Sequence, residues 1–265
     1  MTCPITPSGR VRWLGRVFRD YVASLPIARS RIIDICIGRR LVYVEVEGGY
    51  IGVSFSPSLE PPDESIVALS LAELVSLAWQ HPTLSSLALA GMSATLCYSI
   101  DSSEQLKELY WWVNLLDLID LTGVRRLGMV GFIEPLAKAA RRQGVEVLVY
   151  DDNEVHRALA AREGFRAFTG SQLLADIEDL DYIIASGSAL IDPRLILLAR
   201  RSGIRYSLVG PSSSIPPAVA KTIGAEAVCG CYIPPRVRLK VKTLVKLGYG
   251  FKKVSRLVSK WCYTL

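Results

Sequence analysis

The stretch RRLGMVGFIEPLAKAARRQGVEVLVYDD, residues 125–152, decides the fold of this chain. It holds two short apolar runs, residues 127–131 and 145–150, on either side of a segment with helical spacing at residues 135–143. Strands that are apolar on both faces and alternate with helices are typical of a parallel sheet covered on both sides. We therefore expect a strand, a helix and a second, parallel strand, as in a Rossmann-like domain.

The same alternation continues as far as residue 232. Helical spacing predicts three more helices, at residues 155–163, 193–201 and 216–223. Short apolar runs predict three more strands, at residues 181–185, 204–209 and 227–232. The fold class that follows is α/β, with a Rossmann-like parallel-sheet domain over residues 123–235.

Residues 1–122 have a different pattern, which predicts a smaller α+β domain. Apolar residues at helical spacing from Val11 to Leu25 predict a helix that Pro26 ends. Two β-branched and aromatic runs flank Glu47-Gly48-Gly49 and predict an antiparallel hairpin, at residues 31–46 and 50–55. The remaining expectations are a loop at residues 60–64 and helices at residues 69–79, 84–98 and 104–121.

The last segment, residues 236–265, is strongly basic. The chain has 31 Lys and Arg against 25 Asp and Glu, a net charge of +6, and nine basic residues but no acidic one follow residue 235. Strict alternation predicts a strand at residues 236–242, and an apolar stripe predicts a helix at residues 251–261. The stripe favours packing of this segment on the acidic body over binding of nucleic acid or of a membrane. A homodimer contact through the basic ends stays open.

The mean hydropathy, +0.30, is high for a soluble protein, so a membrane-spanning helix is the first possibility to test. The longest weakly polar run, residues 84–100, contains five Ser and Thr, whereas a spanning helix needs about 20 predominantly apolar residues. No uninterrupted apolar segment follows the N-terminal arginines, so we expect no secretory signal and a cytoplasmic location. In a cytosol the six cysteines would be mostly reduced, although the cytosols of some hyperthermophiles tolerate disulfides.

Ligands of an open parallel sheet collect beyond the carboxyl ends of its strands. Four loops of this chain follow predicted strands there, and two are small, hydroxyl-rich turns that would present backbone N–H groups to an anion. The residues that we expect to bind the ligand are Gly131, Phe132, Glu134, Asp151, Ser186, Gly187, Ser188, Asp192, Gly210, Pro211 and Ser212. Helix capping alone would account for Ser188, Asp192 and Ser214, and this alternative stays open.

Several standard sites are absent or weakly supported. Gly128 and Gly131, followed by Glu134, do not have the spacing of a dinucleotide-binding loop, while S-adenosylmethionine stays open as a ligand. No P-loop, H-E-x-x-H, G-x-S-x-G or paired C-x-x-C motif occurs. His81 and His156 have no evident nucleophile beside them, so we interpret both as surface or capping residues.

Two sets of residues could hold a metal. Cys229 and Cys231 lie on one face of a predicted strand and could bind a soft ion, although no second pair of cysteines or histidines is near in the sequence. The other set consists of loop carboxylates that could meet on one rim and hold a cation or a metal complex: Glu134, Asp151, Asp152 and Asp192. Solvated carboxylates are the commoner case for such loops.

Three stretches of the second domain resemble the putative heavy-metal-chelation family: residues 127–132, 181–192 and 206–213. Three stretches of the first are similar to the companion domain of that family, which has an enolase-N-terminal-like fold: residues 37–44, Gly48-Gly49 and residues 90–94. The resemblance implies a ligand site between the two domains, formed by the loops named above. The family pattern usually has Asn where Asp192 and Ser93 stand, so the resemblance implies a changed specificity if those Asn residues bind the ligand.

Two functions stay open at this point. The first is binding of a small anionic molecule or a heavy-metal chelate in the cleft between the domains. The alternative is an enzyme of cofactor or metal-complex metabolism, with Glu134, Asp151 or Asp192 as general acid or base. The residues leave undecided whether a reaction is catalysed, and whether the cofactor is a heavy-metal ion or a metal chelate.

Overall fold

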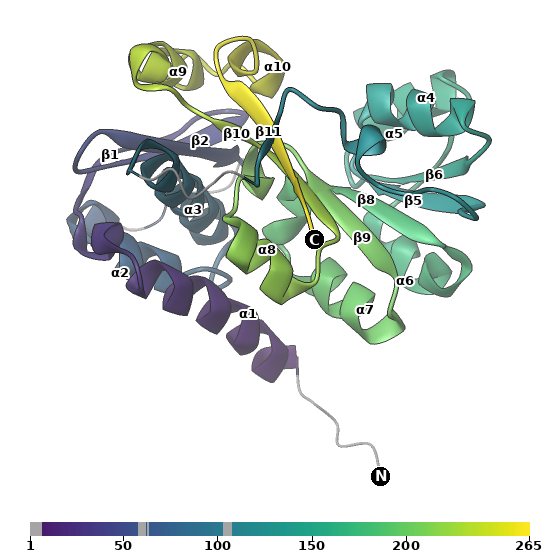
Figure 1. Cartoon of the computed structure of the whole chain (residues 1–265), viewed down its shortest axis with the longest axis horizontal. Coiled ribbons are helices and arrows are strands. Elements are labelled where there is room, and N and C mark those ends of the chain that lie inside the picture. Colours follow the sequence, from purple (N-terminus) through teal and green to yellow (C-terminus); the bar gives the residue numbers. More distant parts are fainter. Residues whose placement is uncertain (1–6, 58–61, 63, 103–107) are drawn as a thin grey trace.

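The computed structural model describes residues 7–57, 62, 64–102 and 108–265. It contains two sheets, a three-stranded antiparallel sheet in the N-terminal part and an eight-stranded, mostly parallel sheet in the rest (Figure 1). A small α+β domain followed by a larger domain with a parallel-rich sheet is the α/β architecture that the sequence pattern predicts, and it is confirmed. We call the two parts the small domain and the large domain.

The small domain pairs three strands with three helices: β1 Ile32–Ile37, β2 Leu41–Val46, β3 Tyr50–Phe55, α1 Pro7–Ala23, α2 Leu71–Ser76 and α3 Pro82–Ser102. The helices predicted from Val11 to Leu25 and at residues 69–79 and 84–98 are confirmed, as is the β2–β3 hairpin, which turns at Gly48 and Gly49 with φ angles of +85° and +77°. The run expected as one strand at residues 31–46 is two antiparallel strands. The Gly38 N–H donates to the Leu41 carbonyl and closes a tight turn between them.

α3 is the central helix of the small domain and packs closely on β3. A Cβ atom at Gly52 would lie 1.9 Å from the Ala90 carbonyl oxygen, so only glycine lets the two backbones approach this far. In the described part of the chain, α3 is the one helix long and apolar enough to cross a membrane, and 78% of its most apolar window is buried inside the protein. α3 is therefore placed as a core helix.

The strands of the large domain are β4 Tyr110–Trp111, β5 Arg126–Val130, β6 Glu146–Tyr150, β7 Arg166–Phe168, β8 Tyr182–Ser186, β9 Arg205–Val209, β10 Ala227–Tyr232 and β11 Ser259–Thr264. Their order is β4-β11-β10-β9-β8-β5-β6-β7. The strands from β5 to β10 pair in parallel, while β11 is antiparallel to both β10 and β4. The chain leaves β5 first towards β6 and β7 and later returns on the other side as β8, so the strand order reverses between β5 and β8.

Helices cover both faces of the large sheet (Figure 1). One face carries α4 Glu134–Arg142 and α5 Glu154–Arg162, and the other carries α6 Leu173–Asp176, α7 Arg194–Ser202 and α8 Pro217–Ile223. The core on the α6–α8 face is continuous with the core of the small domain. From β5 to β10 the sequence pattern predicts every strand and helix named above except β7 and α6, whose three and four residues are too few for a periodic signal.

The helix expected at residues 104–121 is wrong in the part that the structure describes. Residues 108–121 contain β4 and a 3₁₀ turn, η3, at Leu115–Asp117. Trp111 pairs with Trp261 at the edge of the large sheet, and Trp112 has a φ of +62°, which a helix does not admit. Residues 103–107 lie outside the described part, as does most of the loop expected at residues 60–64.

The C-terminal segment also folds differently from its pattern. The strand expected at residues 236–242 is helical, in η8 Pro235–Val237 and α9 Arg238–Lys246, because a helix brings Val241 and Val245 together into the core. The helix expected at residues 251–261 ends early, as α10 Phe251–Val254, and the chain continues into β11. Alternation over only seven residues, 236–242, was too short to distinguish a strand from a helix.

The basic residues of α9 face acidic residues of the small domain. The Lys242 ammonium lies 2.6 Å from an Asp34 carboxylate oxygen and also contacts Glu45, and the Arg238 guanidinium lies 2.6 Å from Asp101. α9 lies beside β1 and β2 in Figure 1. Part of the positive charge of the C-terminal segment is thus neutralised within the chain.

A disulfide joins β10 to β11, between Cys229 and Cys262. The expectation that the cysteines are mostly reduced is therefore wrong for this pair, which the sheet register brings face to face with Cα atoms 4.0 Å apart. The expected metal pair is wrong as well, because Cys229 has no free thiolate while Cys231 is a separate, fully buried thiol.

We predict that the double substitution Cys229→Ser, Cys262→Ser lowers the free energy of unfolding by about 2–4 kcal/mol, because the bond closes a loop of 33 residues in the unfolded chain. Denaturant titration of the wild type with and without reductant, beside the double variant, measures the effect. Superimposable curves for the oxidised wild type and the variant would contradict the prediction.

Candidate functional site

A cavity of about 810 Å³ lies between the two domains, beyond the carboxyl ends of β5, β6 and β8. This is the place where the strand order reverses, and open α/β sheets bind ligands at such switch points. The large domain supplies most of the wall, through the loops after these strands and through α7. The small domain supplies the rest, from the turn between β1 and β2 and from the end of β3: Arg39, Arg40, Phe55, Ser56 and Pro57.

The structure brings six of the expected ligand residues to the cavity wall: Gly131, Phe132, Asp151, Ser186, Ser188 and Asp192. Glu134 is not in the wall, because its carboxylate lies 2.7 Å from the Lys138 ammonium on the outer surface of α4. Four more residues lie outside the cavity wall, and one of them, Ser212, bonds to the small domain: Gly187, Gly210, Pro211 and Ser212.

The turn η7, Pro211–Ser213, connects the domains through one serine. The Ser212 hydroxyl oxygen accepts hydrogen bonds from the Phe55 N–H, at 2.8 Å, and from the Ser54 hydroxyl, at 3.0 Å. From the other side, a Cβ at Gly187 would lie 2.3 Å from the Ser213 nitrogen, so the backbone after β8 touches the backbone of η7. The end of β3 and the loop after β8 are thereby held as neighbouring walls of the cavity.

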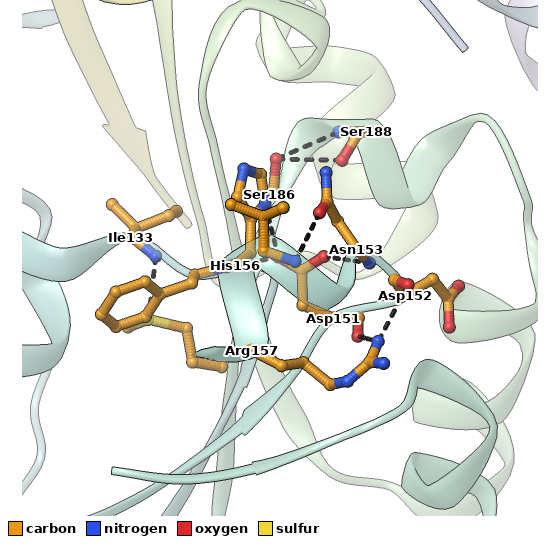
Figure 2. Close-up of polar contacts among 11 residues, drawn as sticks. Ile133, Asp151, Asp152, Asn153, His156, Arg157, Ser186 and Ser188 are labelled. Atoms are coloured by element: carbon orange, nitrogen blue, oxygen red, sulfur yellow. Dashed lines mark hydrogen bonds and ion pairs between the residues drawn. The ribbon is translucent and has the colours of Figure 1, made fainter. Parts of the chain in front are cut away.

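Asp151 and His156 form a pair at the cavity wall (Figure 2). The Asp151 carboxylate accepts hydrogen bonds from the N–H groups of Phe132, at 3.0 Å, and Asn153, at 2.9 Å. The Nδ1 atom of His156 lies 3.0 Å from Oδ2 of the same carboxylate. The Asp151 side chain is only 10% exposed, and these three groups hold its carboxylate in one position.

Hydrogen bonds from Arg157 and Gly170 stabilise the loop that carries this pair. The Arg157 guanidinium donates to the carbonyl oxygens of Asp151 and Asp152, both at 2.8 Å, and the Asp152 carboxylate accepts from the Gly170 N–H at 2.9 Å. Asn153 caps α5 through its side chain and the Val155 N–H. His156 therefore stands on a braced turn, in the first turn of a helix that begins at the cavity.

Charges of both signs surround the cavity. Asp192 is paired with Arg194 at 2.5 Å, and this hydrogen bond raises the pKa of the Arg194 guanidinium. Arg39 and Arg40 are exposed and face the cavity from the small domain. The Ser56 side chain, 1% exposed, also lies in the wall, and its hydroxyl has no hydrogen-bond partner among the described residues.

Sequence reasoning missed Arg39, Arg40 and His156. The two arginines follow Gly38 in a tight turn, but only the docking of the domains brings that turn to the strand ends. The signal for His156 was its place five residues after Asp151, where a carboxylate that follows a strand meets the first turn of the next helix.

A family model described as putative heavy-metal chelation matches residues 114–264, and a second model with the same description matches residues 21–96. The chain belongs to the putative heavy-metal-chelation family. No curated protein matches it significantly.

Two solved structures have the same overall fold, and both are members of this family whose function is unknown. The protein from Pyrococcus horikoshii matches with a TM-score of 0.78 and 20% identity over 95% of this chain and 100% of its own. The protein from Desulfitobacterium hafniense matches with a TM-score of 0.72 and 15% identity over 96% of this chain and 99% of its own. At these identities the likeness shows the fold alone.

The residues of this family member do not form a site for a bare heavy-metal ion in the part of the chain that is described. No three or more His, Cys, Asp or Glu side chains gather there, so the four carboxylates expected on one rim do not converge. Burial raises the pKa of the Cys97 thiol to about 12 and that of Cys231 to about 11, which keeps both protonated at neutral pH. A metal that binds here needs ligands from elsewhere.

We predict that Ser212→Ala lowers the free energy of unfolding by about 1–3 kcal/mol, because the Phe55 N–H and the Ser54 hydroxyl lose their shared acceptor. The matched control is Ser24→Ala, which removes an exposed serine hydroxyl bonded to the Tyr21 carbonyl and should change the value by no more than about 0.5 kcal/mol. Denaturant unfolding compares the three proteins. Equal effects of the two substitutions would show that the Ser212 contact is dispensable.

Proposed function

We propose that this protein binds a small anionic molecule, or a metal in the form of an anionic chelate, in the cavity between its two domains. The observation that carries the proposal is the pair Arg39 and Arg40, which reach the strand-end loops from the other domain. Guanidinium groups are the preferred partners of carboxylates and phosphates. The description of the family supports a metal-related ligand, and the strand-order reversal supports the position.

The size and the lining of the cavity support a small molecule rather than a single ion. Ligand pockets of about 300–1,000 Å³ hold compact organic molecules, and this cavity measures about 810 Å³. One wall is apolar and is formed by Leu173 together with Ile191, Leu195 and Leu198. We infer a ligand whose organic part lies on this wall while its anionic groups face the arginines.

The alternative of an enzyme that uses the cleft carboxylates as acid or base has less support. Glu134 pairs with Lys138 outside the cavity, and Asp192 pairs with Arg194. The Asp151 carboxylate is already engaged by three groups of the chain, the N–H groups of Phe132 and Asn153 and the His156 ring. Binding without a defined reaction is therefore the function that we propose.

The proposal includes a cytoplasmic location and no nucleic-acid or membrane partner. Arg238 and Lys242 of the basic segment pair with acidic residues of the small domain, which reduces the charge available for phosphates. Cys229 and Cys262 are 8% and 3% exposed, so their disulfide is shielded from cytosolic reductants. Association of two copies through the basic ends is a further part of the proposal. Analytical ultracentrifugation measures it as the mass of the protein in solution.

We predict that at least one member of a panel of small carboxylates and phosphates raises the unfolding temperature of the full chain. A ligand present at about 100 times its Kd stabilises a protein by about 2.7 kcal/mol, which corresponds to roughly 5–10 °C here. Arg40→Glu should weaken that binding about tenfold or more because it reverses a charge in the wall. Calorimetric titration gives the two dissociation constants.

The matched control is Arg142→Glu, which makes the same charge change on the exposed surface of α4, outside the cavity. Equal weakening by the two variants would assign the effect to the overall charge and contradict the proposed site. Native mass spectrometry of protein purified without chelators provides an independent readout. No stabilising anion and no retained small molecule together would overturn the proposed function.

A further inference from the structure

We propose that the ligand of this cavity is a metal chelate with an open coordination position, and that the Nε2 atom of His156 fills that position. The inference rests on the proposed function, since it concerns the same cavity, and it goes further by naming the ligand class and the residue that recognises it. Nothing in the family description assigns a role to this histidine.

The hydrogen bond to Asp151 prepares His156 for this role. An ionised carboxylate only accepts hydrogen bonds, so Nδ1 carries a hydrogen, and in the neutral ring Nε2 then has the lone pair that a metal needs. The same carboxylate–histidine arrangement orients imidazole ligands at metal centres and raises their basicity. Nε2 has no hydrogen-bond partner among the residues that the structure describes, and the side chain is 46% exposed in the cavity wall.

One imidazole is not enough for a bare ion. Protein sites for transition metals use three or four side-chain ligands, and the described residues offer no group of three. The other positions must be filled by a chelator that arrives with the metal. His156 then adds a single bond to a complex that is already formed, which is how one imidazole can recognise a metal without a complete protein site.

The surroundings of His156 fit such a complex in size and charge. A cavity of about 810 Å³ is far larger than an ion needs but is suitable for an organic chelator. Arg39 and Arg40 favour a complex with net negative charge. The Ser56 hydroxyl, buried without a described partner in the same wall, offers a further hydrogen bond to the chelator.

The chain contains only one other histidine, His81, and it serves as a matched control. His81 is exposed at the start of α3, and its Nδ1 accepts a hydrogen bond from the Thr83 N–H at 3.3 Å. It is not in the cavity wall, and no carboxylate of the described residues pairs with it. A contribution from surface imidazole in general would therefore be the same at both residues, whereas the proposed site involves His156 alone.

The test uses untagged full-length protein and nickel(II)–nitrilotriacetate, a singly negative complex with open coordination positions. Calorimetry should give one complex bound per chain. His156→Gln should weaken binding about tenfold or more, His81→Gln by less than about twofold, and Arg40→Glu by about threefold or more. Because His156 is half-exposed and glutamine is a good helix former, unchanged unfolding temperature of His156→Gln serves as the check on folding.

Nickel ion alone and metal-free nitrilotriacetate are the two reference probes. Equal binding of the complex by wild type and His156→Gln overturns the inference, as does nickel ion alone binding at His156 as tightly as its chelate. If metal-free nitrilotriacetate binds as well as the complex and depends on Arg40 but not on His156, the inference falls and the proposed function stands. If neither this anion nor any of the panel binds, both fall.

Discussion

The cavity depends on one close contact, the approach of the backbone after β8 to the turn η7. No side chain fits at Gly187, where a Cβ would lie 2.3 Å from the Ser213 nitrogen, and Ser212 extends the contact to the end of β3. The approach of Gly187 to Ser213 lies within the large domain, and the Ser212 hydroxyl joins η7 to the small domain through the Ser54 hydroxyl and the Phe55 N–H. Arg40 and Ser56 can form a wall opposite the strand-end loops only because β3 ends there.

Most of the large domain could be predicted from the sequence because its strands are short apolar runs that alternate with helices of nine or fewer residues. The same reasoning failed at the edge of the sheet. β4 and β11 exist because Trp111 pairs with Trp261 and Cys262 with Cys229, contacts between segments far apart in the chain. Their local patterns suit a helix, and tertiary pairing overrides that preference.

About half of the expected ligand residues line the cavity, and the rule about strand ends accounts for that success. The rule could not separate residues that line the cavity from residues that hold it together, since Ser186 and Ser212 both lie in serine-rich turns after parallel strands. It also gave no access to Arg39 and Arg40, because their position depends on how two domains dock. Docking involves contacts such as those of Ser212 with Ser54 and Phe55, which leave no periodic trace in a sequence.

The possible metal-ligating groups of the described residues restrict how this member of the family could bind a metal. Among its described cysteines, Cys97 and Cys231 are buried, Cys229 and Cys262 are oxidised, and Cys36 is half-buried outside the cavity wall. The carboxylates of Glu134, Asp192 and Asp151 are engaged by Lys138, Arg194 and backbone N–H groups respectively. The resemblance implies Asn where Asp192 stands, yet the extra negative charge of Asp192 is paired with the Arg194 guanidinium. Under the proposed function, the protein would distinguish its ligand by overall charge and by one open coordination position, so the identity of the chelator would decide what binds more than the identity of the metal.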